Sequence, residues 1–200
     1  MDMVLQLWGG SFYLINKMCF SLAEGRGESR KRQLKLWGWG IYILGVPAWV
    51  TILILKHNWI AASIEAGGIP SMALGLFSVY RNNGKNHGAL DGVATVCTYG
   101  FMVLGAGFSL YDYHGLNSVS QVLEIGVMVG FLMGSYYLAK ERHIGWLFFM
   151  LMNGSMGTLM LLQEKPILAF QQGVSLCFVM YGFMRAIGTS LDGEKEIMIR

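Results

Sequence analysis

Three apolar runs of about 20 residues each fill the C-terminal part of the chain, between residues 117 and 187. An α-helix of that length, rising about 1.5 Å per residue, crosses a hydrocarbon layer about 30 Å thick. Only the short charged clusters at 140–143 and 164–166 separate the runs. The pattern therefore predicts an all-α, polytopic membrane protein that is embedded in the lipid bilayer.

The composition favours the same class of protein. Charged residues make up 14% of the chain and apolar residues 54%, whereas ordinary soluble domains carry about 25% charged residues. The 27 glycines are typical of membrane helices that pack closely through small residues. The net charge of +3 is small, and the basic residues fall in short loops, where they orient a membrane protein. Nucleic-acid binding is therefore not expected.

The whole chain predicts about seven transmembrane helices in a single domain, residues 1–189, followed by a charged cytoplasmic tail at 190–200. The expected spans are about 3–20, 36–55, 59–80, 89–110, 117–139, 144–163 and 166–187. The first span resembles a signal peptide, but Asp2 replaces the basic start and no small-residue cleavage site follows. We expect the tail to be frayed or disordered and the run 24–35 to form a loop.

The charges of the loops predict an orientation. Basic loops alternate along the chain with weakly charged ones; the basic loops are 24–35, 81–87 and 140–143, and the weakly charged ones are 56–58, 112–116 and 164–166. Basic loops stay on the cytoplasmic side of a membrane. The sequence thus predicts a multi-pass protein of the cell (inner) membrane, with its N-terminus outside and its C-terminus in the cytoplasm.

The third expected span carries an ionisable residue beside a weak point in the helix. Glu65 is followed by Gly67, Gly68 and Pro70. Glycine and proline weaken and bend helices, and a carboxylate inside a span usually faces a bundle interior or a cavity. We expect Gly67, Gly68 and Pro70 to form a hinge, and Glu65 to be a substrate-binding residue.

A second glutamate repeats this context 59 residues later. Ile64-Glu65-Ala66-Gly67 corresponds to Leu123-Glu124-Ile125-Gly126, and both acids lie about two turns from the outer end of their helices. Paired groups at equal depth are typical of duplicated transporters, whose sites lie between the repeats. Apolar sequences also resemble one another by composition alone, so a chance similarity is the alternative.

The last three spans place further polar groups on facing positions. Gln121 and Glu124 belong to the fifth span, Trp146 and Asn153 lie two helical turns apart on the sixth, and Gln171 lies on the seventh next to Gln172. If these groups share one volume, an aromatic wall with amides and a carboxylate suits a small, flat, polar ligand. The alternative is that the amides link helices and that Trp146 anchors its helix at the interface.

The C-terminal half also carries a series of short motifs. They are Tyr137-Leu138-Ala139-Lys140-Glu141-Arg142, Gly145-Trp146, Asn153, Leu168-Ala169 and Tyr181-Gly182-Phe183. This series resembles the PnuC-type nicotinamide riboside and vitamin transporter family, mainly over residues 117–187. The resemblance implies a SWEET-like fold, with two three-helix bundles joined by a linker helix. It also implies facilitated diffusion of a ligand held by Trp146 and Asn153 and, by a looser match, by Gln121 and Gln171.

The chain departs from the family pattern at several positions. Phe149 stands where the family often has a second Trp, and Met184-Arg185-Ala186 occupies a stretch where a Trp is common. The Pro-Gln dipeptide of SWEET-type helices is absent from the sequence, which argues against a sugar facilitator proper.

These observations predict a membrane facilitator for a small polar solute, nucleoside-like or vitamin-like, such as nicotinamide riboside. The alternative is a non-transporting integral-membrane subunit or scaffold of a larger complex. An enzyme is not expected, because the sequence has no GxSxG or HExxH motif and no His inside a span. No metal or cofactor is expected either, because the three cysteines are far apart and without CxxC spacing. The oligomeric state stays open, a homo-oligomer included.

Overall fold

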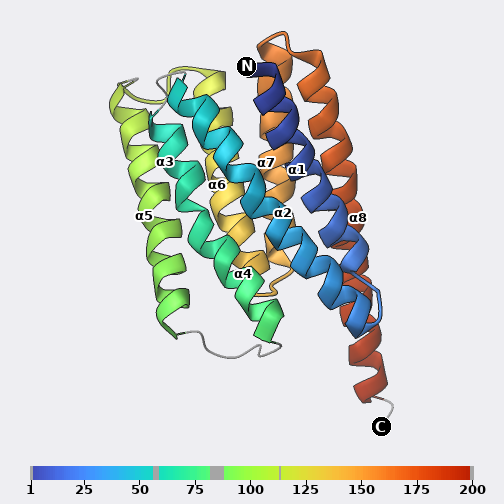
Figure 1. The fold of residues 1–200 in the computed structure, drawn as a ribbon. Helices are drawn as coiled ribbons and strands as arrows, with labels where there is room; N and C mark the ends of the chain where they lie inside the picture. The colour runs from blue at the N-terminus through green and yellow to red at the C-terminus, as the bar shows by residue number, and fades with distance from the viewer. Residues whose placement is uncertain (1, 56–58, 82–87, 113, 199–200) are drawn as a thin grey trace.

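The computed structural model describes residues 2–55, 59–81, 88–112 and 114–198, and these residues are helical along almost their whole length (Figure 1). The helices are α1 (Asp2–Ala23), α2 (Glu28–Leu55), α3 (Trp59–Gly67), α4 (Ile69–Arg81), α5 (Gly88–Asp112), α6 (Val119–Ala139), α7 (Ile144–Leu162) and α8 (Pro166–Met198). The described residues contain no strand. The all-α prediction is confirmed.

Six segments of the described chain are long and apolar enough to cross a membrane. They are Glu28–Leu55, Ala61–Arg81, Gly88–Tyr111, Val119–Ala139, Ile144–Leu162 and Pro166–Gly188. The second joins α3 and α4 into one span, as the sequence predicted for 59–80. α1 is not among the six, but it has 22 residues and packs lengthwise between α2 and α8. The chain is therefore a multi-pass membrane protein.

Two expectations about the ends of helices are wrong. The run 24–35 is a loop only as far as residue 27, because α2 already begins at Glu28. The segment is rich in good helix formers, and its first turn carries the acid that the helix dipole favours. Likewise, α8 continues to Met198 instead of fraying after residue 190. Extending an existing helix avoids the cost of nucleation, which a separate polar segment would bear.

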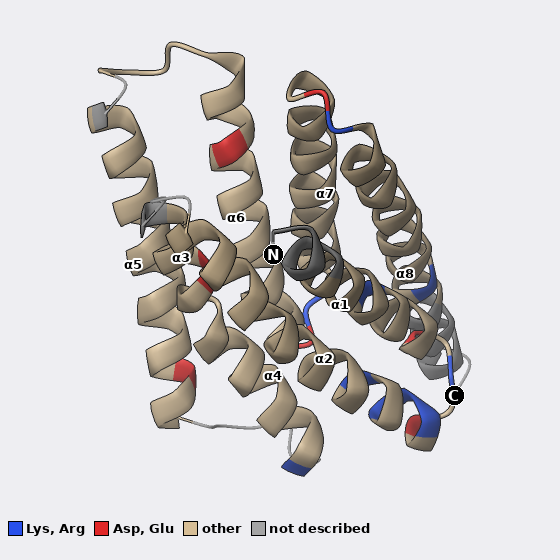
Figure 2. Cartoon of the chain, turned by 45° about the horizontal axis from the view of Figure 1, so that its top comes forward, with Lys and Arg blue, Asp and Glu red and all other residues tan. Residues whose placement is uncertain are grey.

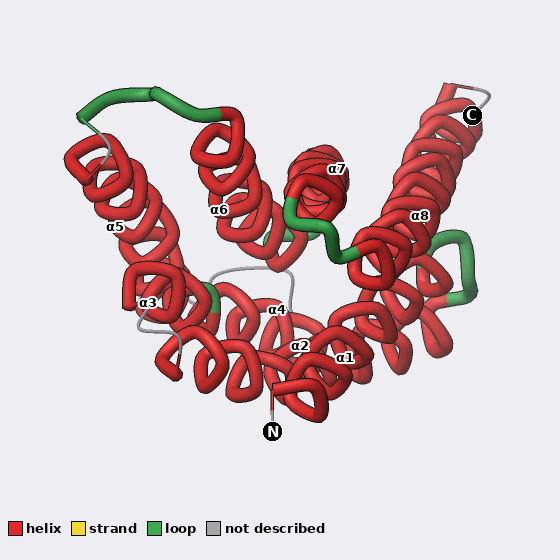
Figure 3. Tube along the Cα trace, turned by 90° about the horizontal axis from the view of Figure 1, so that it is seen from above, coloured by secondary structure: helices red, strands yellow, loops and turns green. Residues whose placement is uncertain are grey.

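The spans form a ring in which neighbours in sequence are neighbours in space (Figure 3). In the first half, α2 packs between α1 and the α3–α4 span; in the second half, α7 packs between α6 and α8. Contacts of α1 with α8 and of α4 with α6 close the ring, and α5 packs against α3, α4 and α6. The two groups of three helices and the linker helix that the family resemblance implies are compatible with these contacts and stay a prediction.

The α3–α4 span is interrupted where the hinge was expected. The Gly68 N–H is shared between the carbonyls of Ile64 (3.2 Å) and Glu65 (3.3 Å), and Pro70 has no N–H to continue the ladder. A Cβ at Gly68 would lie 2.6 Å from the ring of Phe131 on α6. Glycine at the break therefore lets α6 approach the backbone closely, and whether the break bends stays a prediction.

Candidate functional site

A cavity of about 530 Å³ lies between the spans. Residues of α1, α2, α3, α5, α6, α7 and α8 line it, so every span contributes. It extends to Gln163 and Lys165 in the turn between α7 and α8, at the end of the bundle away from the basic N-terminal part of α2 (Figure 2). Its volume is in the range of small-molecule sites, roughly 300–1,000 Å³.

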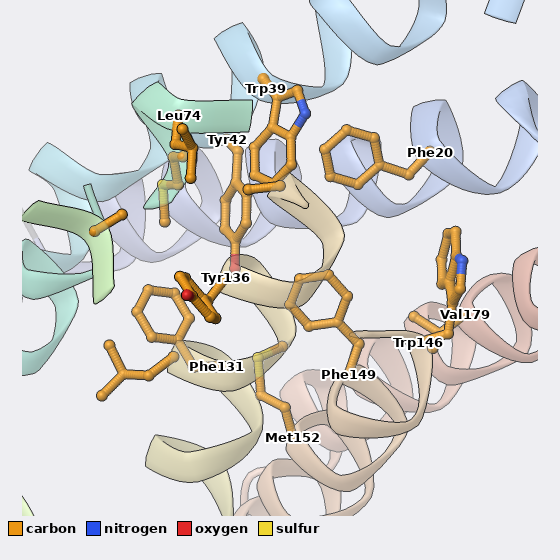
Figure 4. Packing of buried hydrophobic residues seen from close by; sticks show 14 of the residues in the cluster. Phe20, Trp39, Tyr42, Leu74, Phe131, Tyr136, Trp146, Phe149, Met152 and Val179 are labelled. Carbon is orange, nitrogen blue, oxygen red and sulfur yellow. The ribbon is translucent and has the colours of Figure 1, made fainter. Parts of the chain in front are cut away.

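An aromatic layer, formed by Phe20, Trp39, Tyr42, Phe131 and Phe149, belongs to the buried core and borders the cavity at Phe131 (Figure 4). Phe131 lines the cavity and meets the ring of Tyr42 edge-on at 6.1 Å, and Tyr42 also contacts Phe149 at 6.3 Å. Behind Tyr42 lies Trp39, which packs on Phe20 with 4.7 Å between ring centroids. These rings are almost fully buried. Large apolar side chains therefore separate the cavity from the opposite end of the bundle.

A smaller pocket of about 100 Å³ lies beyond that layer. Phe20, Trp39 and Trp146 line it together with charged residues of α2 and of the α6–α7 turn. Lys35 lies 3.7 Å from Glu24 and 3.5 Å from Glu141. This ion-pair cluster joins the N-terminal part of α2 to the turn between α6 and α7.

A carboxylate and a phenol meet in the wall of the large cavity. The Tyr13 hydroxyl of α1 donates a hydrogen bond of 2.6 Å to Oε2 of Glu65 on α3, and both residues line the cavity. The bond joins two helices that the ring holds on either side of α2. The structure therefore places the predicted Glu65 in the candidate site, with a partner from the first span.

An ammonium group lies one turn further along α1. Lys17 lines the cavity and has no exposed surface. Its Nζ donates to Oδ1 of Asn16 at 3.0 Å and lies over the rings of Phe149 and Tyr42, 3.8 and 4.3 Å from their centroids. Asn16 is held in turn by a bond of 3.1 Å to the carbonyl of Gly38. Lys17 is thus fixed in place against the aromatic layer.

The structure brings together four of the six predicted binding residues. Glu65, Glu124, Asn153 and Gln171 all line the cavity, from α3, α6, α7 and α8. Asn153 is buried and donates from Nδ2 to the carbonyl of Phe149, one turn earlier (2.6 Å). This bond orients its amide, and such bonds to the preceding turn are common for short polar side chains inside helices.

The two other predicted binding residues lie elsewhere. Gln121 is buried in the first turn of α6, where its amide bonds to Ser109 of α5 and to Gly115 and Asn117 of the connection between the two helices. Trp146 is buried in the wall of the small pocket, where a Cβ at Gly182 of α8 would lie 2.6 Å from its ring. Neither is among the residues that line the large cavity. The surroundings of Gln121 agree with the alternative in which amides link helices, whereas Trp146 is buried and not exposed as an interfacial anchor would be.

Sequence reasoning missed Tyr13 and Lys17. The available signal was a basic residue within the first apolar run, with a tyrosine four residues before it on the same helical face. For the first span, the sequence analysis asked only whether it is a signal peptide or a membrane helix. Its polar side chains were therefore not considered together with Glu65.

A further ion pair ties α5 to α6 at the basic end. Lys140, just after α6, lies 2.9 Å from Oδ1 of Asp91 in the first turn of α5. A hydrogen bond with Tyr136 and, to a smaller extent, one with Asp91 raise the pKa of the Lys140 ammonium above its ordinary value. Asp91 lies in the first turn of α5, where an acid offsets the helix dipole, and it also pairs with the end of a neighbouring helix.

Together these features define a multi-pass, α-helical membrane protein with a cavity between its helices that both apolar and polar side chains line. Comparisons of the chain with protein-family models, with curated proteins and with solved structures find no match. The resemblance to PnuC-type transporters accordingly rests on the sequence motifs described above.

Proposed function

We propose that the protein is a membrane facilitator for a small polar solute. The observation that carries this proposal is the cavity of about 530 Å³ to which every span contributes side chains. Polar groups inside a membrane bundle are costly and are usually retained for function. Here Lys17, Glu65, Asn153 and Gln171 all reach one volume.

The two ends of the bundle support an alternating-access mechanism. The large cavity extends to one end, and the aromatic layer with the ion pairs around Lys35 closes the other. Carriers of this kind rock one group of helices against the other around a central site. The break at Gly68 gives the α3–α4 span a point at which to bend. With the N-terminus outside, the basic end would be cytoplasmic and the cavity would face outward in the cell (inner) membrane.

The chemistry of the lining favours a flat, polar solute, nucleoside-like or vitamin-like. Asn153 and Gln171 supply amides, Glu65 supplies a carboxylate, and Phe131 and Tyr13 supply ring faces. Rings that stack and a few convergent polar groups are what such ligands need. Nicotinamide riboside, which the sequence resemblance suggests, is one member of this class.

Transport into proteoliposomes tests the proposal. We expect purified protein to take up at least one labelled solute from a panel of nicotinamide riboside, thiamine, riboflavin and deoxynucleosides. Asn153→Ala should reduce uptake about tenfold, as expected for losing a hydrogen bond to the solute and disturbing its neighbours. Thr158→Ala is a matched control, because Thr158 is exposed on the same helix and also bonds to a carbonyl one turn earlier.

Either of two results would contradict the proposal. The first is folded wild-type protein that moves none of the panel, with a second protein that co-purifies; that result favours the non-transporting subunit. The second is equal uptake by wild type and Asn153→Ala, which would mean that the solute does not bind in the cavity on its way across the membrane.

A further inference from the structure

We propose that the carboxyl group of Glu65, positioned by the Tyr13 hydroxyl, binds a proton in each transport cycle and so couples movement of the solute to movement of a proton. This inference rests on the proposed function of the same cavity, a carrier for a small polar solute. It adds the coupling ion and the residue that carries it.

Glu65 is a carboxylate inside a membrane span without a cation against it. It is half-buried and lines the cavity from α3. Among the described residues, no lysine, arginine or histidine nitrogen lies within 4.0 Å of its oxygens. A carboxylate in such surroundings is costly while it is ionised, and taking up a proton removes that cost. Glu65 is therefore suited to exchanging a proton with water in the cavity.

The hydrogen bond from Tyr13 joins Glu65 to a helix on which α3 does not pack. Within the described part of the chain, α1 and α3 both pack on α2 and not on each other. The Tyr13 hydroxyl donates to Oε2 of Glu65 at 2.6 Å. A bond to an ionised carboxylate is about twice as strong as a bond between neutral groups. Protonation of Glu65 therefore weakens the connection between α1 and α3.

Glu65 also lies at the break in its own span. Its carbonyl accepts from the Gly68 N–H at 3.3 Å, and α3 ends at Gly67. A change in the charge of Glu65 thus acts within one helical turn of the place where the α3–α4 span can bend. In carriers built from repeats, coupling ions bind at interrupted helices of this kind. Proton binding at Glu65 can accordingly favour one state of the bundle over the other.

The surroundings of Glu65 support release of the proton as well as its uptake. The other titratable groups near the cavity lie on α1, α2 and α6 and in the α7–α8 turn: Tyr13, Lys17, Tyr42, Glu124 and Lys165. Among the described residues, those of α5, α7 and α8 that line the cavity are uncharged, and α4 has its titratable groups, Tyr80 and Arg81, at its far end. A positive charge on Lys17, one turn from Tyr13, favours the ionised carboxylate and so assists release of the proton.

The proton passes through the cycle without another reactant. While the cavity is open, water delivers a proton to a carboxylate oxygen of Glu65, an O–H bond forms and the group becomes neutral. Once the bundle is open at its other end, that O–H bond breaks and the proton returns to water there. The carboxylate then accepts from Tyr13 again. One proton crosses with each solute molecule, so a proton gradient drives uptake.

Uptake into proteoliposomes under a proton gradient tests the coupling. Purified full-length protein is reconstituted, the membrane potential is clamped at zero with potassium and valinomycin, and the probes are labelled nicotinamide riboside, thiamine, riboflavin and deoxynucleosides. With a tenfold proton gradient, acid outside, wild type should accumulate at least one probe about tenfold, because one proton accompanies each molecule and the two gradients balance. Without the gradient the same probe should only equilibrate. Protein-free liposomes give the background.

Matched variants assign the proton to Glu65. Glu65→Gln keeps an oxygen that can accept from Tyr13 but cannot ionise, so the probe should equilibrate with or without the gradient. Glu124→Gln is the same change at an exposed carboxylate of the cavity. Whatever its effect on the rate, its final accumulation should equal that of wild type.

Tyr13→Phe tests the positioning role separately, because it keeps the ring and removes only the donor. Accumulation should persist in this variant. The loss of solute exchange on raising the pH should occur at a higher pH than in wild type, because the ionised carboxylate no longer accepts a bond from Tyr13. If Glu65→Gln does not fold, this pH profile decides the matter, and an unchanged profile overturns the proposal.

The outcomes separate the coupling from the proposed carrier. Accumulation that Glu65→Gln lacks and Glu124→Gln keeps supports the proposal. Wild type that only equilibrates under the gradient overturns the coupling and leaves the carrier intact. Accumulation by Glu65→Gln, or its loss in Glu124→Gln, overturns the assignment to Glu65. Folded wild type that moves no probe in either condition overturns the carrier and the coupling together.

Discussion

At the scale of single residues, the side chain of Gln121 bonds to backbone groups of α5 and of the connection between α5 and α6. Its Nε2 donates to the carbonyls of Ser109 (3.2 Å) and Gly115 (2.9 Å), and its Oε1 accepts from the Asn117 N–H (3.1 Å). Ser118 caps the same helix by accepting from the Gln121 N–H. A buried amide in this position closes a loop at the membrane edge, where unpaired backbone groups are costly.

We therefore expect Gln121→Leu to lower stability without changing solute affinity. The substitution leaves the Gly115 carbonyl and the Asn117 N–H without this partner, which costs about 1–3 kcal/mol. The measurement is the temperature at which folded protein in detergent is lost, followed by size-exclusion chromatography. Gln171→Leu is the control, because Gln171 lines the cavity and should affect binding more than stability. If Gln121→Leu instead has normal stability and no longer binds the solute, Gln121 is a binding residue.

At the scale of elements, the contact between α6 and α7 depends on a glycine. A Cβ at Gly130 would lie 2.6 Å from the Met152 nitrogen and from the Phe148 carbonyl oxygen, both backbone atoms of α7. Backbone cannot move aside as a flexible side chain can. The two helices therefore approach each other closely only because residue 130 has no side chain.

Gly130→Ala should accordingly destabilise the protein by about 1–3 kcal/mol, as overpacking does. Gly100→Ala is a matched control on α5, because a Cβ there meets nothing within 4 Å. The control should be as stable as wild type or slightly more so, since alanine is a better helix former. Thermal unfolding of both variants in the same detergent makes the comparison, and equal midpoints would refute the role of Gly130.

The elements also show what the sequence could predict. Apolar length alone located the spans from residue 88 to 162 within about two residues, because crossing a membrane fixes helix length. The start of α2 at Glu28 escaped prediction, because basic residues satisfy the positive-inside rule equally well in a loop or in a helix. Gln121 and Asn153 look alike in the sequence, because each is an amide within an apolar span. Only the tertiary contacts show that Gln121 bonds to a loop and that Asn153 lines the cavity.

At the scale of the whole molecule, the ring of helices creates the candidate site. Lys17 and Glu65 lie 48 positions apart in the sequence and reach one cavity because α1 and α3 flank α2. The echo between Glu65 and Glu124 pointed to this volume, since both acids line it. Helical periodicity predicts which residues share a face, but it does not say which faces meet across a bundle. Trp146, for example, lines the small pocket and is not among the residues that line the large cavity.

The basic end of the bundle must open if the protein alternates between two states. Lys35 and Glu141 lie 3.5 Å apart there and connect α2 with the α6–α7 turn. Glu141 is largely exposed, so the pair contributes no more than about 1 kcal/mol. Removing it should favour the state that is open at this end by about two- to fivefold, because that amount of free energy biases a two-state equilibrium by such a factor.

A cysteine at position 139 reports this opening, because Ala139 is 4% exposed and lines the small pocket. In a variant whose three native cysteines are replaced by alanine, Glu141→Gln should speed maleimide labelling of Ala139→Cys about two- to fivefold. Glu164→Gln is the control: Glu164 has almost the same backbone conformation (φ 57° against 56°), but it lies in the turn at the other end. Raising salt should speed labelling of protein that retains Glu141 and have less effect on Glu141→Gln, because salt screens exposed ion pairs. Equal labelling of the two glutamine variants would mean that the Lys35–Glu141 pair does not hold this end closed.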